Sequence, residues 1–164
     1  MSDLQRTVDT AKPILAYHPT TPVHYEKALR EICRAPLEGG PTSELYAFFA
    51  KQLAAGVSNG QIRTSAGESI EEVAARMTGH YATCRERHTG KTILWVSHGL
   101  ATSAFLCTVL DLSYDRPIMM DYIMDNGGVA IVSSHGSGKP TLDLFNCQKH
   151  NEDSRKDSPI KPTA

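Results

Sequence analysis

The chain has few cysteines, no long apolar run and no excess of either charge, and each scarcity excludes a class of protein. Its four cysteines form no Cys-x-x-Cys pair, which favours reduced thiols over a disulfide framework. No apolar run approaches the length of a transmembrane helix, and the first residues lack the apolar core of a signal peptide. Lysine and arginine number 17 against 18 aspartates and glutamates, so no basic surface for nucleic acid is expected. These absences predict a cytoplasmic protein that binds neither membrane nor nucleic acid.

The composition that remains is that of an ordinary globular domain. The chain has 164 residues, of which 40% are hydrophobic and 21% charged, enough to bury a core within one domain. From Gln148 onward it is charged, contains proline and has almost no apolar residues. We therefore expect one domain at 1–147 and a disordered tail at 148–164.

Hydrophobic periodicity and turn residues predict the secondary structure. Helices are expected at 3–15, 42–55, 69–88 and 100–112, and strands at 23–29, 93–97, 129–133 and 141–145. Pro13 is expected to end or kink the first helix. Helices alternating with strands predict an α/β domain of three layers, with a mostly parallel sheet and an antiparallel hairpin at its end.

The most informative motif is Ser97-His98-Gly99, which follows the apolar run Ile93-Leu94-Trp95-Val96 and precedes a helix. This pattern predicts a strand, a tight turn and a helix, with the imidazole beside the helix N-terminus. Free amides and the helix dipole both favour a bound anion at such a place, and phosphate is the natural candidate.

Five segments, in order and spacing, resemble the histidine phosphatase (phosphoglycerate mutase-like) superfamily. They are Ser2–Ala11, Leu29-Arg30-Glu31 with Leu37-Glu38-Gly39, Gly67–Val73, Ser97-His98-Gly99, and Asn126-Gly127-Gly128. The resemblance extends from Ser2 to about Asn146. Within the superfamily, Leu37–Leu45 looks most similar to the TIGAR-like branch, which removes the 2-phosphate of fructose 2,6-bisphosphate.

The resemblance implies hydrolysis of a phosphomonoester such as a sugar phosphate, through a phosphohistidine and without metal or organic cofactor. It implies that Arg6, His98 and Gly99 bind phosphate and that Glu31 is the general acid. Glu44 and Glu68 are candidates to line the substrate entrance. A homodimer stays open.

Each assignment has a simpler alternative. Arg6 could be an exposed helical arginine, Glu31 could pair with a neighbouring arginine, and Glu44 and Glu68 could be solvated carboxylates near helix starts. The set His80, Cys84 and His88 has metal-ligand spacing on one helix, but Cys84 belongs to the apolar stripe, so we predict no metal site.

The chain departs from the family pattern at the nucleophile. The family's nucleophilic histidine lies in an Arg-His-Gly segment at the end of the first strand, and this sequence contains no such tripeptide. The nearest string, Arg87-His88-Thr89-Gly90, precedes the 93–97 strand and does not end one. The resemblance implies that two strands flanking 93–97, and the helix between them, are absent. We therefore expect this chain to be inactive or nearly so.

Three accounts stay open. The sequence is an N-terminally truncated form of an active phosphatase, a shortened pseudoenzyme that binds phosphorylated ligands or a protein, or a chain whose sheet is completed by a second copy or another protein.

Overall fold

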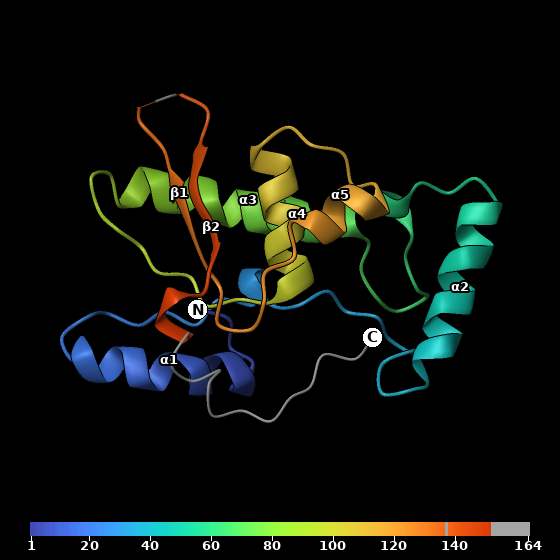
Figure 1. The fold of residues 1–164 in the computed structure, drawn as a ribbon, viewed down its shortest axis with the longest axis horizontal. Helices are drawn as coiled ribbons and strands as arrows, with labels where there is room; N and C mark the ends of the chain where they lie inside the picture. The colour runs from blue at the N-terminus through green and yellow to red at the C-terminus, as the bar shows by residue number, and fades with distance from the viewer. Residues whose placement is uncertain (137, 152–164) are drawn as a thin grey trace. The chain divides into compact units, whose positions relative to one another are not determined.

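Helices build the first of two units into which the chain divides, Met1–Ile123 and Met124–Ala164 (Figure 1). A computed structural model describes residues 1–136 and 138–151. The first unit contains α1 (Gln5–Tyr17), α2 (Thr42–Ala54), α3 (Ile70–Arg87), α4 (Gly99–Val109) and α5 (Arg116–Asp121), with 3₁₀ turns at Lys27–Leu29 and Asn59–Gln61. The second unit contains β1 (Val129–Ser133), β2 (Thr141–Cys147) and a 3₁₀ turn at Lys149–Asn151.

The longest helix, α3, begins and ends where its sequence signals predict. The Ser69 hydroxyl accepts the Glu72 amide proton while the Glu72 carboxylate accepts the Ser69 amide proton, which is a capping box. Beyond the C-cap His88, Gly90 adopts a positive φ of 73°, which glycine tolerates without strain. The helix predicted at 69–88 is therefore confirmed.

The core of the first unit lies between α3 and α4. Val73 and Met77, four residues apart on α3, are 1% exposed, and Leu106 of α4 is equally buried. An aromatic cluster extends this core, with the ring of Trp95 5.2 Å from Phe105 and 6.2 Å from Tyr81. Burial of this apolar surface is the main force that holds the two helices together.

The strand predicted at 93–97 is not formed. Ile93 and Leu94 are 43% and 60% exposed, and the segment is extended without strand pairing in the described part of the chain. One backbone bond joins it to the N-terminal residues, from the Ser2 amide to the Val96 carbonyl at 2.9 Å. A strand needs a neighbour to pair its backbone groups, and apolar composition alone does not supply one. The strand predicted at 23–29 is also wrong, since its end forms the 3₁₀ turn Lys27–Leu29.

The second unit has the predicted hairpin. Strands β1 and β2 pair antiparallel, and among the described residues they are the one paired sheet. β1 matches the expected range, and β2 runs two residues past it, to Cys147. The turn before β1 is closed by the Gly128 amide, which donates to the Asp125 carbonyl at 2.9 Å. In the tail predicted at 148–164, Lys149–Asn151 form a 3₁₀ turn, and 152–164 lie outside the described residues.

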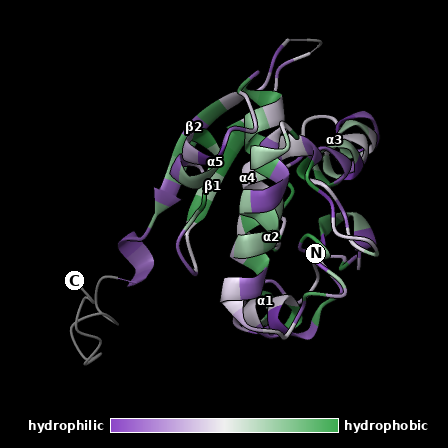
Figure 2. Ribbon diagram, turned by 90° about the vertical axis from the view of Figure 1, so that its right-hand side faces the viewer, coloured by the Kyte–Doolittle hydropathy of each residue, from purple (hydrophilic) through white to green (hydrophobic). Residues whose placement is uncertain are grey.

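The remaining helices differ from expectation at particular places. α1 continues through Pro13, which does not end it. α4 stops at Val109, three residues before the predicted end, and α5 forms where neither a helix nor a strand was predicted. α2 matches its predicted range, but none of its residues is buried, although Figure 2 shows hydrophobic residues along it. Over the described residues, every helix is too short or too polar to cross a bilayer.

The buried position of Met77 predicts a large loss of stability on truncation. Met77→Ala should lower the free energy of unfolding by about 2–5 kcal/mol, because it leaves a cavity between α3 and α4. Met120→Ala, at a side chain that is 54% exposed, is the matched control and should change stability by less than about 0.5 kcal/mol. Urea unfolding of the two variants measures both values, and equal losses would contradict the proposed core.

Candidate functional site

His98 is the N-cap of α4, with its ring held from both sides. The Arg6 Nε donates to the His98 Nδ1 at 3.0 Å, and the His98 Nε2 lies 2.9 Å from the Ser2 Oγ. An arginine nitrogen is always a donor, so Nδ1 is the acceptor and the proton of the neutral ring is assigned to Nε2. The structure thus selects one tautomer of a neutral imidazole.

Burial and nearby charge both act on the protonation of this ring. Burial lowers the pKa of His98, and the positive charges of Arg6 and Arg76 lower it further, while Glu31 acts in the opposite direction. The net effect is a His98 pKa below the usual 6.5. The folded state therefore favours the neutral ring that the hydrogen bonds require.

Arg6 lies on the first turn of α1 and is exposed, yet it is not a free surface arginine. Its Nε is held by the His98 ring, while its two terminal nitrogens have no partner among residues 1–136 and 138–151. α1 begins three residues after the buried Ser2, so the start of this helix places both ring partners of His98. Arg6 and His98, ninety-two positions apart, are thus brought together as predicted.

The Glu31 carboxylate rests on the N-terminus of α4. Its oxygens accept the amide protons of Leu100 at 3.3 Å and Ala101 at 2.9 Å, and that of its neighbour Ile32 at 2.9 Å. These α4 amides have no partner inside the helix, so the carboxylate serves as a cap supplied by a distant loop. Two of the amides predicted to attract a phosphate are therefore already occupied by a side chain.

A cavity of about 360 Å³ lies beside Glu31. Its lining is Leu4, Arg6, Arg30, Glu31, Ile32, Cys33 and Glu38. The charge of Arg30 is matched by Asp3, because Nε and Nη2 each donate to one carboxylate oxygen at 2.6 Å. This pairing holds the pKa of Asp3 below its usual value. In the cavity wall, Arg6 is thus the cation whose terminal donors have no partner in the described residues.

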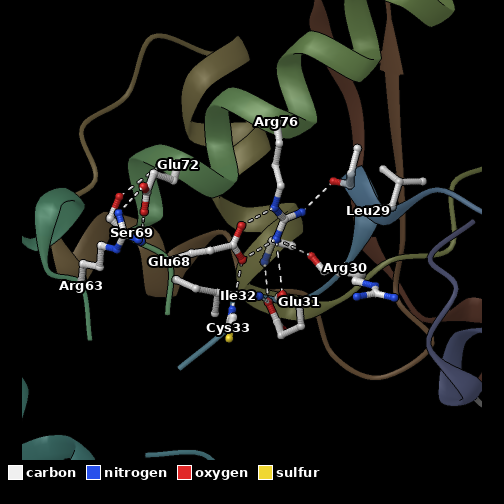
Figure 3. Close-up of polar contacts among 12 residues, drawn as sticks. Leu29, Arg30, Glu31, Ile32, Cys33, Arg63, Glu68, Ser69, Glu72 and Arg76 are labelled. Atoms are coloured by element: carbon white, nitrogen blue, oxygen red, sulfur yellow. Dashed lines mark hydrogen bonds and ion pairs between the residues drawn. The ribbon is translucent and has the colours of Figure 1, made fainter. Parts of the chain in front are cut away.

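Arg76 of α3 links Glu68 to Glu31, because its guanidinium donates to the Glu68 carboxylate and to the Glu31 carbonyl (Figure 3). The two carboxylate oxygens of Glu68 accept from Arg76 at 2.8 and 3.2 Å, and one also accepts the Cys33 amide proton at 3.1 Å. Burial acts to raise the pKa of Glu68, but the bonds from Arg76 and Cys33 outweigh it and lower the pKa. Glu68 borders a second cavity, of about 460 Å³, together with Glu31 and Arg76.

Two predicted site residues, Glu44 and Gly99, contribute no side-chain contact to this site. Glu44 is exposed in the first turn of α2 and borders neither cavity beside Glu31, so the structure does not bring it to this site. Gly99 begins α4 next to His98, and a methyl group added there would meet the Ile123 Cγ2 at an ordinary 3.6 Å. The backbone itself therefore does not require glycine at this position.

Sequence reasoning missed three residues that hold the site. Ser2 contacts the His98 ring, Asp3 pairs with Arg30, and Arg76 contacts Glu68. The Glu68–Arg76 spacing of eight residues, about two helical turns, was the available signal for the last pair. Among the described side chains, no group of three potential ligands lies close enough together to hold a metal ion.

The lowered pKa of His98 predicts how stability depends on pH. Below about pH 6.5 the unfolded chain binds a proton at this position that the folded chain resists. The contribution of His98 is therefore complete above the unfolded pKa and is lost as the pH falls through the folded pKa. His98→Asn should reduce the loss of unfolding free energy between about pH 7.5 and pH 5.5, measured by urea unfolding. His80, whose pKa burial also lowers, supplies a residual slope of the same sign. An unchanged slope in His98→Asn would contradict the assignment.

Comparison with known proteins places these residues in a family. A model of the histidine phosphatase superfamily (branch 1) matches residues 1–148. A probable phosphoglycerate mutase GpmB of Yersinia enterocolitica is 37% identical over 114 residues, covering 68% of this chain and 52% of the relative. The chain thus spans about half the length of the curated relatives it matches.

Solved structures show the same fold. YhfR of Bacillus stearothermophilus has a TM-score of 0.79 at 22% identity, covering 92% of this chain and 74% of that one. A phosphoserine phosphatase variant of Entamoeba histolytica, bound to phosphoserine, has a TM-score of 0.75 at 25% identity, covering 91% and 73%. A mycobacterial glucosyl-3-phosphoglycerate phosphatase has a TM-score of 0.71 at 25% identity, covering 88% and 73%. These likenesses confirm the predicted α/β class, and with the family match they show that this chain belongs to the histidine phosphatase superfamily.

Proposed function

We propose that the first unit binds the phosphate group of a phosphomonoester at Arg6, His98 and the start of α4. The observation that carries this proposal is the geometry of Arg6, which lines the cavity beside Glu31. Its Nε is fixed on the His98 ring, and its two terminal nitrogens have no partner among residues 1–136 and 138–151. A guanidinium with two parallel donors suits a phosphate, which it can hold with two charge-assisted hydrogen bonds. The Gly99 amide would add a neutral donor, while the His98 ring, whose two nitrogens are engaged by Arg6 and Ser2, would hold the guanidinium in place.

The parent activity we propose for the family site is hydrolysis through a phosphohistidine, for which the nucleophilic histidine has no counterpart in this sequence. Charge stabilisation by Arg6, held in place by the His98 ring, would lower the barrier to phosphoryl transfer, because the transferred group carries its negative charge on the equatorial oxygens. Glu31, which borders the same cavity, would protonate the leaving oxygen. Its contacts with the Leu100 and Ala101 amides place this carboxyl group next to the His98 end of α4.

The substrate class we propose is a small phosphorylated molecule, with a sugar phosphate as the first candidate. Support comes from the names of the relatives, which describe phosphoglycerate, phosphoserine and glucosyl-phosphoglycerate chemistry. The resemblance of Leu37–Leu45 to the TIGAR-like branch favours a sugar. Just before this segment, the Cζ atom of Arg34 lies 4.5 Å from the ring centre of Phe49 on α2. The loop that contains Arg34 and helix α2 would therefore shape substrate specificity together.

A second candidate function is binding without turnover. The sequence has no Arg-His-Gly segment and hence no counterpart of the family's nucleophile. Arg6 and the Gly99 amide would hold an anion without breaking a bond, so the 164-residue chain would act as a phosphate-ligand or protein-binding pseudophosphatase.

Phosphate binding tests the site directly. Inorganic phosphate should bind the full chain by titration calorimetry and raise its melting temperature, because a ligand of the folded state stabilises it. Arg6→Ala should weaken binding about tenfold to hundredfold, the size of a lost charge-assisted bond. Lys12→Ala is the matched control, since it removes an exposed cation of the same helix that pairs with Asp9. Equal weakening in both variants would reduce the effect to general surface charge and contradict the site.

Turnover separates the two candidate functions. We expect the 164-residue chain to release phosphate from p-nitrophenyl phosphate no faster than its His98→Ala variant, because the nucleophile is missing. Phosphate release is measured at equal protein concentration for both chains. If the original chain releases phosphate and His98→Ala does not, the chain is not inactive, and catalysis is assigned to this site.

A further inference from the structure

The Arg76 side chain donates several hydrogen bonds near the site. Among the described residues, none of these bonds goes to His98 or Arg6. The Arg76 guanidinium donates to three backbone carbonyls in one short segment, those of Ala28 at 2.7 Å, Arg30 at 2.8 Å and Glu31 at 3.3 Å. The same group donates twice to the Glu68 carboxylate (Figure 3). All three guanidinium nitrogens are therefore engaged.

Glu68 extends this grip to the far side of Glu31. Its carboxylate accepts the Cys33 amide proton at 3.1 Å, and its own amide donates to the Cys33 carbonyl at 2.9 Å. Arg76 thus holds the chain before Glu31, and Glu68 holds it two residues after. The backbone on both sides of Glu31 is tied to α3.

The loop needs such a tie because it has little regular structure of its own. The segment from Arg30 to Arg34 forms no helix or strand, so no backbone ladder fixes where Glu31 lies. Leu29 is fully buried and anchors one end. The Glu31 side chain must nevertheless reach the Leu100 and Ala101 amides on another helix.

We infer that Arg76, with Glu68, is the positioning residue of this site and holds the loop so that the Glu31 carboxylate occupies the N-terminus of α4 beside His98. The inference deepens the proposed function and rests on it for the role of Glu31. Glu68, expected as a substrate-lining residue, becomes the partner of a positioning arginine. A guanidinium suits this task because its rigid planar fork can bind a carboxylate and several carbonyls at once.

Positioning predicts a spectroscopic change at residues that Arg76 does not touch. In ¹H–¹⁵N spectra of the full chain, Glu31→Ala should shift the Leu100 and Ala101 amide resonances, because their acceptor is removed. Arg76→Met should shift the same two resonances in the same direction while the chain stays folded. Arg76→Lys, which keeps the charge but not the fork, should give an intermediate shift.

Arg63→Met is the matched control. The charge of Arg63 also acts to lower the pKa of Glu68. The Arg63 side chain, however, donates its hydrogen bond to Glu72 at 2.8 Å and is 55% exposed. It should leave the Leu100 and Ala101 resonances in place. If Arg76→Met does not fold, Glu68→Gln tests the inference instead. This variant weakens the contacts of the Glu68 carboxylate with Arg76 and Cys33 but leaves the three hydrogen bonds from Arg76 to backbone carbonyls. Unmoved Leu100 and Ala101 amides in a folded Arg76→Met chain, or in Glu68→Gln, would overturn the inference.

Phosphate affinity provides the second readout. If Glu31 is released from the α4 amides, these donors become available to an anion, so Arg76→Met should bind inorganic phosphate several-fold more tightly. In a Glu31→Ala background the same substitution should have no further effect, whereas a merely structural role would give equal effects in both backgrounds and overturn the inference. If no variant binds phosphate but the amide shifts follow the prediction, the proposed function fails and the positioning role stands.

Discussion

The clamp that Arg76 forms between α3 and the Glu31 loop is the interaction on which the rest of the site depends. A half-buried guanidinium is stable only when its donors are matched, and here a carboxylate and three carbonyls match them. Because α3 packs on α4 through the buried core, the clamp also fixes the loop relative to the helix that carries His98. Core packing and site geometry are thus parts of one arrangement.

The N-terminus of α4 is occupied in part by a carboxylate of the chain itself. Glu31 accepts the Leu100 and Ala101 amide protons, while the His98 ring accepts a hydrogen bond from Arg6. A helix N-terminus stabilises negative charge through its free amides and its dipole. In the function we propose, a phosphate would use the remaining Gly99 amide, and the protonated Glu31 carboxyl group would lie next to the leaving oxygen, which is the geometry that proton transfer requires.

Much of the site could be predicted from motifs and only part of it from physical reasoning on the sequence. The Ser97-His98-Gly99 motif placed the imidazole at a helix start, and Arg6 was assigned to it by resemblance to the family; both positions agree with the structure. The contact of Ser2 with His98 and that of Arg76 with the Ala28 carbonyl could not be predicted, because they join segments that are far apart in the chain. Glu44 lies outside the lining of both cavities beside Glu31, and nothing local to α2 decides where that helix points.

Local sequence is enough to specify the elements whose stabilising bonds are local. The capping box of α3 and the Asp125–Gly128 turn before β1 are satisfied within a few residues, so their positions followed from the sequence. The segment 93–97 has a strand's composition but not a strand's pairing, because the partner backbone must come from elsewhere in space. The position of Glu31 was likewise decided by tertiary structure, since its three amide partners and the Arg76 clamp come together only when α3, α4 and the loop have packed.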